Sequence, residues 1–161
     1  MNEEKKEKSI EEELAKEGFY VSTTVGTSMM PMLRNRRDRI VLVPRGKERL
    51  RRYDLPIYRR DDGKYVLHRI IAVKKGHYVI RGDNTYQKEY VSEDQIVGVV
   101  SEFYRGEKHV STASRGYRAY AAIWHFIFPL RRFFLGARRL ASKVKRKIYS
   151  LLRKVWKRNA T

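Results

Sequence analysis

Residues 54–73, which read DLPIYRRDDGKYVLHRIIAV, have the pattern of a β-hairpin. Asp61, Asp62 and Gly63 are typical turn residues, and β-branched and aromatic residues flank them on both sides. Pro56 has no N–H to donate to a central ladder, so it marks an edge or a bulge. The pattern predicts strands over 54–59 and 65–73, joined by a tight turn.

Short runs of the same kind lie on both sides of this hairpin. They predict strands at 19–25, 40–43, 77–80 and 96–100, separated by turn residues. Before them, Ser9-Ile10-Glu11-Glu12 has the form of a capping box, which predicts a short helix from Ser9 to Glu17; a frayed charged tail is the alternative. We therefore expect a charged helix or tail over 1–17 and a mainly β domain over 18–110.

The last third of the chain differs in charge and in pattern. Residues 114–161 contain 14 Lys and Arg residues and no acid, and they supply most of the net charge of +19 of the 161-residue chain. Apolar residues recur at intervals of three and four from Ala137 to Val155, which is the helical period. Pro129 and Gly136 predict a division into two helices. We expect a basic amphipathic helical arm over 111–161.

Composition excludes several classes of protein. Hydrophobic residues make up 42% of the chain and cysteine is absent, which excludes wholesale disorder, disulfides, thiolate nucleophiles and zinc fingers. Met1 to Gly18 has no apolar signal core, and the run from Tyr120 to Leu130 is shorter than the roughly 20 residues of a bilayer span. His77, His109 and His125 lack the spacing of metal ligands. We expect no metal and no cofactor. The expected location is cytoplasmic, peripheral at the membrane surface.

Three segments combine residues of chemical interest. Ser28 follows a predicted strand and a Gly-Thr turn, which can expose its hydroxyl and turn backbone N–H groups toward a carbonyl oxygen. His68 can take the serine proton at physiological pH. Asp83, in Gly82-Asp83-Asn84, offers a carboxylate that would fix the tautomer of such a base. Each feature alone is more often structural, and together Ser28, His68 and Asp83 could supply a nucleophile, a base and a carboxylate in that chain order.

These segments resemble the superfamily of signal peptidase I and LexA-type self-cleaving repressors, which are serine peptidases on a mostly β fold. Its nucleophile box, Ser-Met-x-Pro-x-Leu, is matched by Ser28, Met29, Pro31 and Leu33. The His68-Arg69 pair is similar to that of the endoplasmic-reticulum and archaeal signal peptidases, and a Gly-Asp-Asn box follows in both. The resemblance covers about residues 17–100 and implies a signal-peptidase/LexA-like β fold.

The resemblance also implies roles for individual residues. Ser28 would be the nucleophile, His68 the general base, and Asp83 a residue that orients or stabilises the site. The His-containing branch has a second acid a few residues after Gly-Asp-Asn, and Glu89 is the nearest candidate here.

The resemblance also implies which residues would form the oxyanion hole and the substrate groove. Gly26 has no hydroxyl to offer, so the backbone N–H groups of Ser28 and Thr27 would form the oxyanion hole. The substrate groove would include Met29, Val66 and Leu67. One departure is Tyr53-Asp54, which stands where the family often has Gly-Asp.

Two functions remain open at this stage. The first is a serine endopeptidase that cleaves a leader or signal-type peptide. The second is a non-catalytic module of the same fold. In either case the basic arm, which is rich in aromatic residues, could bind an anionic membrane surface, could bind nucleic acid, or could pack on its own β domain.

Overall fold

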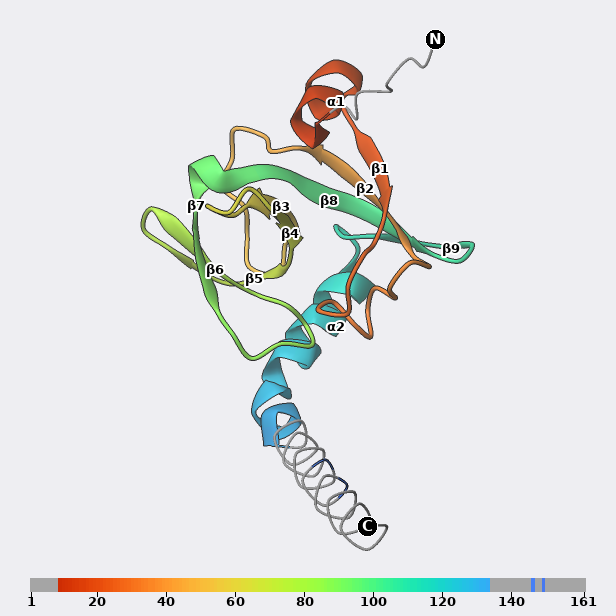
Figure 1. The fold of residues 1–161 in the computed structure, drawn as a ribbon, viewed down its shortest axis with the longest axis vertical. Helices are drawn as coiled ribbons and strands as arrows, with labels where there is room; N and C mark the ends of the chain where they lie inside the picture. The colour runs from red at the N-terminus through yellow and green to blue at the C-terminus, as the bar shows by residue number, and fades with distance from the viewer. Residues whose placement is uncertain (1–8, 134–145, 147–148, 150–161) are drawn as a thin grey trace, which may run out of the picture. The chain divides into compact units, whose positions relative to one another are not determined.

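β-Strands dominate the computed structural model, which describes residues 9–133, 146 and 149 (Figure 1). The expected mainly β class, with a helix near the N-terminus and helices on the C-terminal side, is confirmed. The elements are α1 (Ile10–Glu17), β1 (Tyr20–Thr23), β2 (Arg39–Pro44), β3 (Pro56–Arg59), β4 (Tyr65–Leu67), β5 (Arg69–Lys74), β6 (His77–Arg81), β7 (Glu89–Ser92), the 3-10 helix η1 (Glu93–Gln95), β8 (Ile96–Arg105), β9 (Lys108–Ser111) and α2 (Arg115–Phe126).

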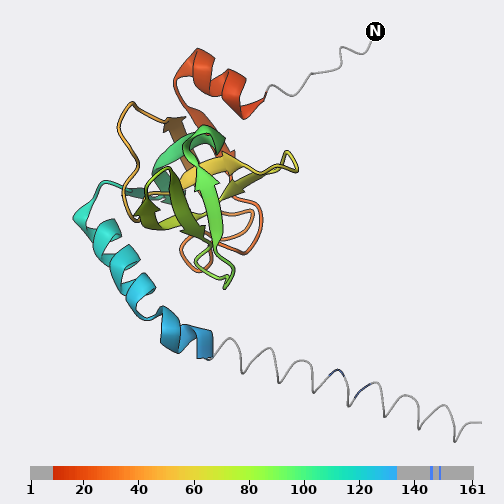
Figure 2. The ribbon, with the colours of Figure 1, turned by 90° about the vertical axis from the view of Figure 1, so that its left-hand side faces the viewer.

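The strands form two antiparallel sheets. The larger sheet has the order β1-β2-β8-β3-β4, with β9 also paired to β8, and the smaller sheet has the order β5-β6-β7. The long strand β8 pairs with β2 on one side and with β3 on the other, with Ile40 opposite Phe103 and Ile57 opposite Gly98. Figures 1 and 2 show β8 running through the larger sheet, with the β6–β7 hairpin beside it.

The predicted hairpin forms, but the strand after its turn is interrupted. Gly63 has a φ of 80° and its N–H donates to the carbonyl of Arg60, which closes the turn between β3 and β4. The prediction of one strand over 65–73 was wrong. The chain leaves the larger sheet after Leu67 and enters the smaller sheet at Arg69, so His68 lies at the crossing between the two sheets.

The predicted N-terminal helix is confirmed together with its capping box. The Ser9 side chain accepts a hydrogen bond from the Glu12 N–H, and the Glu12 side chain accepts one from the Ser9 N–H. Leu14, only 3% exposed, is the residue that α1 buries. A Cβ added to Gly98 would lie 3.0 Å from Leu14 Cδ1, so the helix packs closely on β8.

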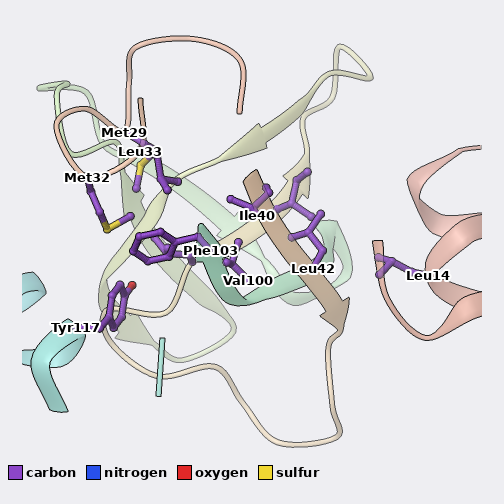
Figure 3. Packing of buried hydrophobic residues seen from close by; sticks show 11 residues of the cluster. Leu14, Met29, Met32, Leu33, Ile40, Leu42, Val100, Phe103 and Tyr117 are labelled. Atoms are coloured by element: carbon purple, nitrogen blue, oxygen red, sulfur yellow. The ribbon is translucent and has the colours of Figure 1, made fainter. Parts of the chain in front are cut away.

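The main core cluster includes side chains from the loop that carries Ser28. Figure 3 shows Met29, Met32 and Leu33 of this loop in the same cluster as Phe103 and Tyr117. These loop side chains are all buried, with exposed fractions of 5% or less. Burial of each such side chain contributes on the order of 2 kcal/mol, so the loop is fixed by the core that it helps to form.

The chain divides into two compact units between Ile123 and Trp124. The first unit therefore extends beyond the expected domain end at residue 110, and it includes the buried residues Tyr117 and Ala121 of α2. In the second unit, residues 128–133 are helical. Gly136 and the apolar repeat from Ala137 to Val155 lie outside the described residues. No helix in the described part is both long enough and apolar enough to cross a membrane.

Candidate active site

The loop between β1 and β2 is organised around the buried carboxylate of Asp38. Asp38 accepts from the Arg34 backbone N–H at 2.7 Å and from the Arg34 guanidinium at 2.8 Å. The Asp38 carbonyl accepts from the Thr24 N–H at 3.0 Å, which joins the two ends of the loop. Burial alone would raise the pKa of Asp38, but the hydrogen bonds from Arg34 outweigh it and lower that pKa.

Within this loop, a turn at Gly26 presents Ser28. Gly26 has a φ of 97°, in the left-handed region where glycine is the unstrained residue, and its N–H donates to Asn35 Oδ1 at 2.8 Å. Met29 and Leu33 point into the core, whereas Ser28 stays half-buried. The N–H groups of Thr27 and Ser28 have no acceptor among the described residues. Of the two residues, Ser28 lines the cleft described next, whereas Thr27 is not among its lining residues.

Ser28 lines a cleft of about 520 Å³ that lies in the first unit. One wall comes from β1 and the residues after it, and another comes from β4. The three residues predicted to form a substrate groove, Met29, Val66 and Leu67, all line this cleft. His68 and Glu89 line the same cleft, so the structure brings the proposed nucleophile, the base and the second acid to one surface.

His68 is positioned by hydrogen-bond partners on its Nδ1 side. The side chain is 8% exposed, and Nδ1 lies 3.1 Å from Glu89 Oε1 and 3.3 Å from the hydroxyl of Tyr58. A proton on Nδ1 donated to the Glu89 carboxylate leaves Nε2 as an acceptor. The ring can therefore act as a base through Nε2.

Gly82 brings the three sequence segments together. A Cβ at this position would lie 2.8 Å from the Ser28 carbonyl oxygen and 3.0 Å from His68 Nε2. The Ser28 carbonyl also accepts from the Asn84 N–H at 2.7 Å. Within the described residues no hydrogen bond joins the Ser28 hydroxyl to His68.

Arg60 pairs with both oxygens of the Glu89 carboxylate and shares one of them, Oε1, with His68. Its Nε and one terminal nitrogen donate to the two carboxylate oxygens at 2.6 and 2.7 Å. Burial would raise the pKa of Glu89, but the Arg60 hydrogen bonds outweigh it, so the pKa is lowered and the carboxylate is ionised at neutral pH. Burial lowers the pKa of His68, and the positive charge of Arg60 adds to this against the opposing effect of Glu89.

Asp83 lies in a different environment from the one expected for a residue next to the base. Its two oxygens accept from Arg69 at 2.8 and 2.7 Å, and both side chains are almost fully buried. Arg69 also donates to the Tyr117 hydroxyl at 2.7 Å and to Met32 Sδ at 2.9 Å. The carboxylate at the imidazole is that of Glu89, and Asp83 stabilises the framework through Arg69.

The backbone conformation of Tyr53 bears on the Tyr53-Asp54 pair, which stands where the family often has Gly-Asp. Its φ is 79°, a left-handed conformation in which glycine is the usual residue. Its N–H donates to the Ile70 carbonyl at 2.8 Å and its own carbonyl accepts from the Tyr117 hydroxyl at 2.6 Å. These bonds hold a non-glycine residue in the conformation that this bend requires.

Two residues of the site, Tyr58 and Arg60, were not identified from the sequence. Both lie at the end of β3 or just after it, where they read as strand and turn residues. Their partners come from β7 and the crossing, which no local pattern reveals. Among residues 9–133, 146 and 149, no group of three His, Asp or Glu side chains could hold a metal ion.

Compared with known proteins, the chain matches no family model and no curated protein sequence.

Proposed function

We propose that this chain is a serine endopeptidase of the signal-peptidase type, which cleaves a leader or signal-type peptide. The observation that carries the proposal is the cleft in which Ser28 lies beside a His68–Glu89 pair, with Nδ1 of the histidine 3.1 Å from the carboxylate. The order of the three sequence boxes, and their meeting at Gly82, supports a signal-peptidase/LexA-like fold.

The reaction follows from the roles that this geometry allows. His68 Nε2 takes the proton of the Ser28 hydroxyl as Oγ attacks the scissile carbonyl carbon. The N–H groups of Ser28 and Thr27 would stabilise the oxyanion, and Glu89 the charged imidazole. The imidazolium then protonates the leaving amine as the C–N bond breaks. Water, deprotonated by His68, releases the acyl group and restores the serine.

The cleft also indicates how a peptide would bind. The strands β1 and β4 stand at the two ends of the strand order in the larger sheet, and residues from both line the cleft. An extended peptide can add to such a strand edge through main-chain hydrogen bonds. Apolar side chains such as Tyr20, Ile57 and Leu67 line the walls, which favours small or apolar substrate residues before the cut.

A non-catalytic module of the same fold is the alternative. Such a module needs neither a histidine held by a carboxylate in the cleft nor two N–H groups left without acceptors beside a serine. The peptidase accounts for both features, so we favour it.

A comparison of new protein N-termini in host cells tests the proposed activity and the substrate together. Cells would express wild type, Ser28→Ala or Ser22→Ala at equal abundance. Ser22 is the matched control, because it is another serine that lines the cleft. We expect a set of N-termini with wild type and Ser22→Ala that is missing with Ser28→Ala. Identical sets in all three would contradict the peptidase.

The rate of cleavage should depend on pH through His68. The base acts when neutral, and its pKa lies below its ordinary value of 6.5, so activity should persist below pH 6.5 and be lost as pH falls through the lowered pKa. Arg60→Gln removes a positive charge near the ring, so the acid limb of the kcat/KM profile should move to higher pH. Arg59→Gln, the exposed neighbouring arginine, is the control and should leave the profile in place. A profile that Arg60→Gln does not move would contradict this role of Arg60.

Gly82→Ala should impair cleavage much more than stability. The new methyl group would meet both the Ser28 carbonyl and the His68 ring, so one of them must shift. A displacement of the reacting groups by about 1 Å can cost on the order of a hundredfold in rate. Kinetics and thermal unfolding would be compared with Gly46→Ala, where a Cβ meets nothing within 4 Å. Wild-type kinetics for Gly82→Ala would show that the close packing of the Ser28 carbonyl and the His68 ring on Gly82 does not affect the rate of cleavage.

A further inference from the structure

The helical residues of the second unit carry a row of exposed apolar side chains. Phe126, Leu130 and Phe133 are 84%, 61% and 71% exposed. Phe126 ends α2, and Leu130 and Phe133 lie in the helical residues 128–133. The Arg131 N–H donates to the Ile127 carbonyl at 3.0 Å, a helical bond across the turn, so the spacing of four and three residues places the three side chains on one face. By contrast, Tyr117 and Ala121, which lie in the first unit, are 3% and 0% exposed. We call the exposed row, formed by Phe126, Leu130 and Phe133, the apolar stripe.

Positive charge accompanies the apolar stripe. Arg131 and Arg132 lie beside Leu130 in the sequence, and the Arg131 guanidinium lies 3.5 Å from the centre of the Trp124 ring. The sequence from residue 114 to the C-terminus contains 14 basic residues and no acid. Residues 114–161, which we call the basic segment, therefore combine large apolar side chains with charge of a single sign.

We propose that this segment docks on an anionic lipid surface, with the apolar stripe in the acyl region and the arginines among the headgroups. A basic amphipathic helix of this composition is suited to the membrane interface, where each Lys or Arg near the surface adds about 1 kcal/mol. Phosphate groups of nucleic acid would engage the charges, but they would leave an aliphatic side chain such as Leu130 in water. The lipid surface is the partner that uses both features, and its binding does not depend on the proposed peptidase activity.

Vesicle binding by the full chain tests this docking. The probes are vesicles of phosphatidylcholine alone and vesicles that also contain phosphatidylglycerol. We expect sedimentation with the anionic vesicles only, weakened by salt. In a Trp156→Phe background, which leaves Trp124 as the only tryptophan, the emission should shift to shorter wavelength on binding. Absence of binding to anionic vesicles would overturn the proposal.

Substitutions in the apolar stripe separate insertion from simple charge attraction. Phe126→Asp with Leu130→Asp should weaken vesicle binding by about tenfold or more, because two large apolar groups can no longer be buried. Phe19→Asp with Tyr90→Asp is the matched control, since both residues are exposed (51% and 70%) in the first unit and the total charge change is the same. The milder pair Phe126→Ser with Leu130→Ser serves if the aspartate variant unfolds.

Two further results would overturn the proposal. In the first, the stripe variants bind anionic vesicles as well as the wild type. In the second, the chain binds an oligonucleotide duplex tightly and the vesicles only weakly, which would assign the basic segment to nucleic acid.

Discussion

Replacing Ser28 by alanine should abolish peptide cleavage and leave the fold intact. The substitution removes only the hydroxyl that would attack the substrate, while Met29 and Leu33 keep the loop in the core. Loss of a serine nucleophile in this kind of site reduces kcat by about a thousandfold or more. We expect the same loss in His68→Ala, because neither group works without the other. Cleavage rates and thermal unfolding of both variants would be measured on the substrate identified from new N-termini.

A matched substitution makes this result specific. Ser22→Ala removes a hydroxyl from the same cleft and should keep the wild-type rate. Cleavage by Ser28→Ala at the wild-type rate would remove Ser28 from the proposed mechanism. An unchanged melting temperature in both serine variants would show that the difference is chemical and not a loss of folded protein.

Replacing Arg69 by methionine should cause the largest loss of stability. Arg69 and Asp83 form a buried ion pair, with side chains that are 2% and 3% exposed. Removing one member of a buried pair leaves the other charge uncompensated, which costs about 3–5 kcal/mol. Arg69 also contacts Tyr117 and Met32, so α2 and the Ser28 loop lose a shared partner. Urea unfolding would give the difference in the free energy of unfolding.

Two further variants test the cause of that loss. Arg69→Met combined with Asp83→Asn removes both charges and should recover part of the stability. Arg118→Met breaks the pair with Asp54, which is partly exposed, and should cost about 1 kcal/mol or less. If Arg69→Met cost no more than Arg118→Met, the buried pair would not be what stabilises this part of the fold.

Local sequence signals predicted the elements whose structure is decided locally. The capping box at Ser9 and Glu12 formed as expected, because all its hydrogen bonds lie within one turn. The Asp61-Asp62-Gly63 turn did so for the same reason. The break at His68 was missed, because the strand-like residues Val66 and Leu67 before it and Ile70 and Ile71 after it read as one run, and only the partner strands differ. The strands β7 and β9 were missed because Glu89–Ser92 and Lys108–Ser111 mix polar and apolar residues without a clear alternation.

In the candidate site, too, the sequence showed local features and did not show contacts between distant residues. The order of the boxes around Ser28, His68 and Asp83 was visible in the sequence, and the fold brings these boxes together at Gly82. The partners of each acid were not visible. Arg60 and Glu89 are separated by 29 residues, and Arg69 and Asp83 by 14, so the fold decides which carboxylate meets the imidazole and which one is held by a buried arginine.

The position of His68 at the crossing between the two sheets has a consequence for the newly made chain. Its neighbours Tyr58 and Glu89 come from β3 in one sheet and β7 in the other. A half-folded molecule with a single sheet would therefore lack one of the two groups that contact His68 Nδ1. In the proposed peptidase, hydrolysis would begin only after both sheets have docked.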